Sequence, residues 1–119
     1  MAAVLVALVD DDESVRESLP DLLRELGYEA RAFACAEDFL ADAESMSRAG
    51  CLILDVVMPG LSGPELHTEL LRRGRSIPTL FISALTGSAL PPGPQVASLI
   101  KPFSEQELRA GLAKLLPGA

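Results

Sequence analysis

The sequence is poor in several residue types on which common classes of protein depend. Its 119 residues include no tryptophan, one tyrosine, one histidine and two cysteines. Cys35 and Cys51 show neither a CxxC spacing nor a Cys/His metal spacing, so we expect reduced, structural thiols. Positive charge is also scarce, with 10 basic against 17 acidic residues and a net charge of −7. This balance disfavours direct contact with nucleic acid or an anionic membrane surface and favours a cation as partner.

Long hydrophobic runs are missing as well. The apolar stretch 4–9 has no basic lead and is cut off by Asp10, Asp11 and Asp12. We therefore expect neither a signal peptide nor a membrane-spanning helix, and a cytoplasmic location. With 119 residues, 49% of them hydrophobic, the chain fits one domain over residues 1–119.

Short apolar runs alternate with helical patterns along the chain. Apolar or alternating runs predict strands at residues 4–9, 28–33, 51–55, 79–83 and 96–100, the second of them nearer an edge. Helical spacing and start signals predict helices at residues 14–26, 36–46, 63–73 and 104–116. Capping boxes are expected at Ser14/Glu17 and Ser104/Glu107. Such alternation implies an α/β fold with right-handed crossovers and a doubly wound parallel sheet.

Four of the predicted strands end on residues that can do chemistry. These residues are Asp10 to Asp12, Asp55, Ser83 and Lys101. In an open parallel sheet the carboxyl ends of the strands share one edge, where ligands bind, so we expect these side chains to be neighbours. Alternatively, the first three acids form a solvated helix-capping turn, Asp55 is a turn acid and Lys101 a surface lysine. Asp12 fits a surface or helix-entry position better than a ligand position.

An acidic cluster of this kind favours a bound cation. Two carboxylates about 4 Å apart repel by about 4 kcal/mol near a protein surface, and a divalent cation relieves that repulsion. Oxygen ligands without histidine or cysteine favour a hard ion, and a small site completed by water suits Mg2+ better than Ca2+. A lysine and a hydroxyl beside one carboxylate complete the parts for phosphoryl transfer, with Asp55 as the nucleophile.

These residues resemble the receiver domains of two-component response regulators. The matching motifs, in order and over essentially the whole chain, are Asp10-Asp11, Asp55 with Met58-Pro59-Gly60, Ser83-Ala84 and Lys101-Pro102-Phe103. In detail they look most like receivers that precede a helix-turn-helix output domain. The resemblance implies a flavodoxin-like (CheY-like) sheet of five parallel strands in the order 2-1-3-4-5.

The resemblance also implies a set of site residues and partners. A histidine kinase or phosphotransfer protein would transfer a phosphoryl group to Asp55. Mg2+ would be held by Asp11, Asp55 and the backbone carbonyl of Val57, with Asp10 reaching it through water. Lys101 would contact the phosphoryl group, and Ser83 would move toward that group on activation. The peptide bond between Lys101 and Pro102 would be cis. The signal would pass to a downstream protein or a linked output domain, from a monomer or weak dimer.

The chain departs from the family pattern after the fourth predicted strand. The interval from Ser83 to Lys101 is about one helical turn short and rich in glycine and proline, which predicts a shortened or irregular fourth helix. Ser98 stands where the family has a switch aromatic. We therefore hypothesise that phosphorylation orders or displaces residues 85–95. Val57 and Leu85 occupy the positions that flank the attacking water, and both are apolar, which predicts slow self-dephosphorylation.

The expected function is a signalling switch and not an enzyme that acts on an external substrate. One alternative is a pseudoreceiver, a protein-binding module of the same fold that is not phosphorylated. Another is a metal-dependent phosphatase, which is disfavoured because Val57 stands where such enzymes have a second acid. The single histidine, His67, is expected on an exposed helix face with no part in the chemistry.

Overall fold

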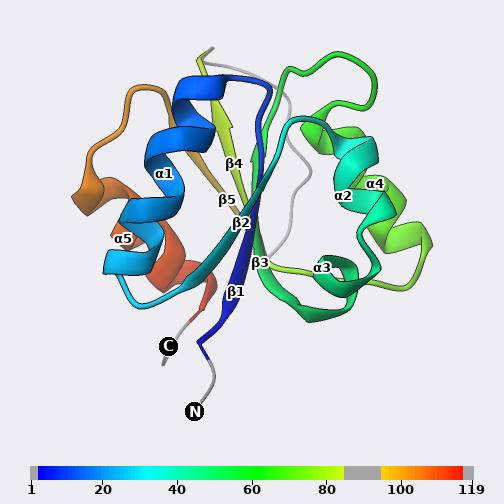
Figure 1. The fold of residues 1–119 in the computed structure, drawn as a ribbon, viewed down its shortest axis with the longest axis horizontal. Coiled ribbons are helices and arrows are strands. Elements are labelled where there is room, and N and C mark those ends of the chain that lie inside the picture. The colour runs from blue at the N-terminus through cyan, green and yellow to red at the C-terminus, as the bar shows by residue number, and fades with distance from the viewer. Residues whose placement is uncertain (1–2, 85–94, 117–119) are drawn as a thin grey trace.

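The structure is a computed structural model that describes residues 3–84 and 95–116. Strands and helices alternate along the described chain (Figure 1). Their order is β1 (Leu5–Val9), α1 (Glu13–Glu25), β2 (Glu29–Phe33), α2 (Ala36–Ala41), α3 (Ala43–Arg48), β3 (Ala49–Asp55), α4 (Gly63–Arg72), β4 (Thr79–Ser83), β5 (Val96–Ile100) and α5 (Glu105–Leu115).

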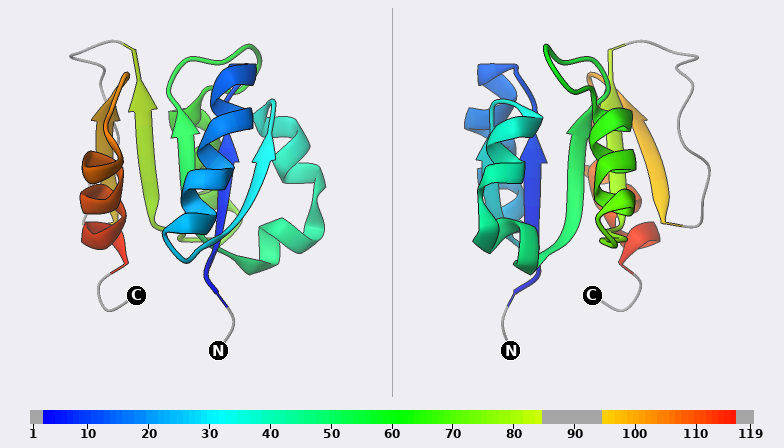
Figure 2. Two further views of the ribbon diagram at one scale, coloured as in Figure 1. Left: turned by 60° about the vertical axis from the view of Figure 1, so that its left-hand side comes forward. Right: turned by 90° about the vertical axis from the view of Figure 1, so that its right-hand side faces the viewer.

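The strands form one parallel sheet in the order β2-β1-β3-β4-β5, which confirms the predicted flavodoxin-like topology. The runs of β1, β4 and most of β3 are buried, as expected for strands covered on both faces. The alternating run of β2 lies at an edge, as predicted. All the strands point the same way, so their carboxyl ends share one edge of the sheet (Figure 2).

Helices cover both faces of this sheet. The helices α1 and α5 lie on one face, and α2, α3 and α4 lie on the other (Figure 1). Each face has its own apolar core, one including Leu23 and Leu112 and the other including Phe39 and Leu66, all fully buried. Burying one such side chain contributes about 1.5–3 kcal/mol, so these helix stripes hold the sheet rigid behind its functional edge.

The start of α1 differs from the prediction. Asp12 is the N-cap, because its carboxylate accepts hydrogen bonds from the backbone N–H of Ser14 at 2.9 Å and from the Ser14 hydroxyl at 2.8 Å. The capping box expected at Ser14/Glu17 is therefore wrong, because a carboxylate two residues earlier provides the cap. The capping box at Ser104/Glu107 is confirmed, and another, Ser62/Glu65, begins α4.

The predicted helix over residues 36–46 is two helices. Asp42 leaves the helical conformation at φ −93° and ψ 93°, and its carboxylate accepts the Ser45 N–H that begins α3. Arg31 of β2 pairs with Asp42 at 3.6 Å and with Glu44 at 2.5 Å. These bonds stabilise a break that turns α3 toward β2, and periodicity alone does not reveal them.

His67 is another correction, since it is half-buried and not exposed. Its ring makes an edge contact with Phe81 of β4, with centroids 5.7 Å apart, and burial lowers its pKa. The Leu66 and Leu70 stripe of α4 faces the sheet and brings its neighbour His67 against it.

Both cysteines are free, as expected, and burial raises the pKa of Cys51 to about 12.

Two expectations concern a part of the chain that the structure does not describe. The irregular fourth helix and the switching segment 85–95 fall almost wholly outside the described residues. Ser98 lies exposed on β5, in register with Phe81. Within residues 3–84 and 95–116, no helix is both long and apolar enough to cross a membrane.

Candidate functional site

The strand ends bring together the residues that the sequence nominated. Asp10 and Asp11 follow β1, Asp55 is the last residue of β3, and their carboxylates each place an oxygen within 4.8 Å of the others. Ser83 ends β4 and is buried, and its carbonyl oxygen accepts the backbone N–H of Lys101 at 2.7 Å. The prediction that these distant positions are neighbours is therefore confirmed.

Asp10 is fully buried and held on every side. One carboxylate oxygen accepts the backbone N–H of Asp12 at 2.9 Å, and the other accepts the Lys101 ammonium at 2.8 Å. Its carbonyl oxygen accepts the Arg16 guanidinium at 2.9 Å. A buried charge persists only when it is paired and hydrogen-bonded, so Lys101 and these donors fix Asp10 in place.

Lys101 lies between the two buried carboxylates. Its ammonium is 2.8 Å from an Asp10 oxygen and 3.7 Å from an Asp55 oxygen. The peptide bond to Pro102 is cis, as the family resemblance implies. Burial by itself would lower the pKa of Lys101, but the hydrogen bond to Asp10 and the charges of Asp10 and Asp55 outweigh it and raise the pKa. Lys101 therefore remains a cation at the centre of the site.

The surroundings of Asp55 change its acid–base behaviour. Burial and the nearby Asp10 carboxylate raise its pKa from 3.8 to about 6, against the opposing charge of Lys101 and a hydrogen bond from the Val57 N–H. The ionised form of Asp55 is thus destabilised while no cation is bound beside Lys101. Additional positive charge at the cluster would favour the carboxylate.

This shift predicts how stability depends on pH in metal-free protein. The folded state binds the Asp55 proton more tightly than the unfolded chain does, because its pKa of about 6 exceeds 3.8. The Asp55 contribution is therefore least favourable above the folded pKa and improves as the pH falls through about 6 toward 4. In urea titrations with a chelator, the Asp55→Asn variant should be the more stable protein at neutral pH, and its advantage should shrink as the pH falls. An advantage that is constant with pH would contradict the raised pKa.

The donors at the site fit a hard divalent cation. Asp11 is exposed beside the buried Asp10 and Asp55, so the three carboxylates combine an open side with a fixed base. Oxygen donors with room for water are the environment that Mg2+ prefers. Asp10, Asp11 and Asp55 could therefore hold the ion, and the backbone carbonyl of Val57 remains the predicted further ligand.

The loop after β3 closes against the backbone of Asp55. Gly63, the first residue of α4, donates its N–H to the Val56 carbonyl at 3.2 Å. A Cβ atom at Gly63 would lie 2.4 Å from the carbonyl oxygen of Asp55, which is too close for any side chain. The start of α4 therefore supports the backbone of Asp55 directly.

Comparison with known proteins gives this arrangement a family. Residues 6–113 match the response regulator receiver domain. The chain belongs to this family. It is a receiver domain of two-component signalling, with the five-stranded fold that its sequence predicted.

Individual relatives agree with this assignment. The response regulator protein TodT of Pseudomonas putida is 37% identical over 119 residues, covering 96% of this receiver domain and 52% of TodT. The solved structure of the response regulator StyR has a TM-score of 0.85 at 40% identity, covering 97% of this chain and 60% of that one. TrrA from Thermotoga maritima, solved in complex with Mg2+ and BeF, has a TM-score of 0.80 at 27% identity, covering 95% of this chain and 99% of that one. The receiver domain thus spans about half the length of the curated relatives it matches.

Sequence reasoning missed three residues that support this site. They are Arg16, which holds the Asp10 carbonyl, Gly63, which abuts Asp55, and Glu37 of α2, which bonds to the loop after β3. Arg16 and Glu37 look like ordinary solvated charges of helices in the sequence. A glycine before a proline at a helix start was the available signal for Gly63, but it indicated only the helix boundary.

Proposed function

We propose that Asp55 is the phosphoacceptor of this receiver domain and that Mg2+ is its cofactor. The observation that carries the proposal is the convergence of three carboxylates within 4.8 Å, with the Lys101 ammonium 3.7 Å from Asp55. A pseudoreceiver would not need this complete set of residues.

The residues of the chain then have distinct roles in the transfer. An Asp55 carboxylate oxygen attacks the phosphorus of a phosphohistidine, a P–O bond forms, and the P–N bond breaks. The histidine leaves as neutral imidazole because its other ring nitrogen already carries a proton in the phosphohistidine. Lys101, already held by Asp10, neutralises charge on the phosphoryl oxygens. When bound, Mg2+ would supply further charge neutralisation for the same oxygens. Ser83 ends β4 at the same edge of the sheet, and its hydroxyl would move toward the new group.

The family and the greater length of its relatives support a proposal for the partners. We propose a histidine kinase or phosphotransfer protein as the phosphoryl donor. The chain spans about half the length of relatives such as TodT. We therefore also propose that the signal passes to a covalently linked output domain or to a separate downstream protein.

A small phosphodonor tests the central claim without knowledge of the kinase. Acetyl phosphate with Mg2+ should add one phosphoryl group to the wild-type protein, stable in acid and labile in base and to hydroxylamine. Peptide mapping after borohydride reduction should place it at Asp55. Absence of such an acyl phosphate would favour the pseudoreceiver.

The lifetime of the phosphorylated form depends on Val57. Val57 is 62% exposed beside the site, and its apolar side chain cannot orient a water molecule by hydrogen bonding. We expect slow self-dephosphorylation. A Val57→Asn substitution should shorten the lifetime by about tenfold, because an amide can orient the water molecule but accelerates hydrolysis less than a general base does. The measurement is the decay of the acyl phosphate after the donor is removed. A wild-type half-life of seconds, or no response to Val57→Asn, would contradict this prediction.

A further inference from the structure

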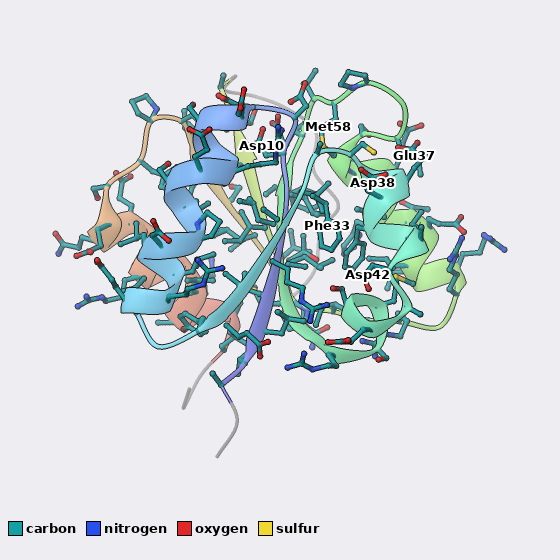
Figure 3. The ribbon with its side chains drawn as sticks, viewed as in Figure 1. Asp10, Phe33, Glu37, Asp38, Asp42 and Met58 are labelled. Atoms are coloured by element: carbon teal, nitrogen blue, oxygen red, sulfur yellow. The ribbon has the colours of Figure 1, made fainter. Side chains whose placement is uncertain are left out.

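The loop between β3 and α4 follows the phosphoacceptor and is tied to a neighbouring helix. Leu61 donates its backbone N–H to a carboxylate oxygen of Glu37 at 3.2 Å, 24 residues away in the sequence. Glu37 lies in the first turn of α2, at the end of the helix that faces this loop (Figure 3). Met58 is buried in the core beneath the loop, whereas Val57 is exposed.

The loop is also shaped to receive this carboxylate. A Cβ atom at Gly60 would lie 2.8 Å from one oxygen of Glu37 and 3.2 Å from the other, so a side chain there would displace Glu37. Gly60 also has a φ of +77°, which favours glycine. The Pro59-Gly60 turn therefore allows the carboxylate to reach the next residue, Leu61.

The charge of Glu37 is suited to this contact. Hydrogen bonds from its own backbone N–H and from that of Leu61 lower its pKa, so it accepts as a carboxylate at neutral pH. A charged acceptor makes a stronger bond to a backbone N–H than a neutral one does. Within residues 3–84 and 95–116, the adjacent acid Asp38 makes no such hydrogen bond, although it is exposed on the same turn of α2 and has a side chain of similar charge.

We propose that Glu37 is a positioning residue for the metal site. By holding Leu61, it fixes the loop that begins at Val57 and so keeps the Val57 carbonyl directed toward the ion. This inference rests on the proposed function, in which that carbonyl is a Mg2+ ligand. Groups that orient metal ligands from outside the coordination shell commonly set the affinity, since a displaced ligand binds more weakly.

The test compares Glu37→Ala, Glu37→Gln and the matched control Asp38→Ala. Loss of the carboxylate in Glu37→Ala should raise the Mg2+ dissociation constant by about tenfold, measured by NMR titration with Mg2+ alone. Glu37→Gln should restore most of the affinity, because its amide oxygen can accept the same N–H. Asp38→Ala removes the same charge from the same turn and should stay within roughly twofold of wild type. Urea midpoints of all variants check that the fold is intact.

The Leu61 amide proton separates this inference from the proposed function. Its chemical shift in metal-free protein should move in Glu37→Ala and stay close to wild type in Glu37→Gln. If the Leu61 chemical shift does not change in Glu37→Ala, the proposed contact between Leu61 and Glu37 is wrong. A shift that responds while Mg2+ affinity does not, or an equal loss in Asp38→Ala, would overturn the positioning role. If the wild-type protein binds no Mg2+, the proposed function itself fails, and the inference about Glu37 fails with it.

Discussion

Replacing Asp55 with asparagine should reduce acyl phosphate formation from acetyl phosphate by more than about 1000-fold, because the amide is not a nucleophile. The substitution keeps the size of the side chain at the end of β3. It also removes a carboxyl group whose ionised form is destabilised by burial and by Asp10. The metal-free variant should therefore unfold at a higher urea concentration than wild type at neutral pH, so lost phosphorylation cannot be assigned to lost structure.

The matched control for this experiment is Asp38→Asn. Asp38 is an exposed acid on α2, and the same change there should leave the phosphorylation rate within roughly twofold. Mass spectrometry of intact protein follows both variants over time. Undiminished, base-labile labelling of Asp55→Asn would mean that a different carboxylate of the cluster is the acceptor.

Replacing Gly63 with alanine should both destabilise the fold and slow phosphorylation. The added methyl group would lie 2.4 Å from the Asp55 carbonyl oxygen and 3.1 Å from its carbon, so either β3 or α4 must move. Overpacking of this kind costs about 1–3 kcal/mol of the free energy of unfolding. Because the displaced backbone carries the carboxylate that we propose as the nucleophile, we expect the phosphorylation rate to fall by at least about tenfold.

A second glycine provides the control. Gly111 lies in α5, where a Cβ atom would meet the end of the Leu80 side chain at 3.3 Å, a contact that a small rotation relieves. Alanine is also more favourable than glycine in a helix interior by about 1 kcal/mol. The Gly111→Ala variant should therefore unfold at a urea concentration equal to or above that of wild type. Urea unfolding and the rate with acetyl phosphate, measured on both variants, decide the result. Equal behaviour of Gly63→Ala and wild type would show that α4 does not support Asp55.

The sequence was sufficient to predict the sheet and the residues that meet at the carboxyl ends of its strands. An apolar run that stops at an acid, such as 51–55, predicts both a strand and the residue at which the strand ends. Once the strands are parallel, topology brings Asp10, Asp55 and Lys101 together, because every carboxyl end lies on one edge. These features depend on local pattern and on the direction of the chain, and both can be read without coordinates.

The supporting contacts could not be predicted in the same way. The bond from Leu61 to Glu37 spans 24 residues, and the contact of Gly63 with Asp55 depends on how α4 leaves the sheet. The break at Asp42 depends on Arg31, which pairs with Asp42 and Glu44 from another strand. Each arises from the three-dimensional approach of elements whose own sequences look ordinary, so local propensity contains no trace of it.

The ion pairs around β2 have a further consequence for the free edge of the sheet. An edge strand offers unpaired backbone groups to which a strand from another molecule can add, and charged side chains hinder that addition. On β2, Glu29 pairs with Arg48 at 2.6 Å and Arg31 pairs with Glu44, while Arg24 donates to the Ala30 carbonyl at 3.3 Å. The same contacts that turn α3 toward β2 therefore protect the protein against edge-to-edge aggregation.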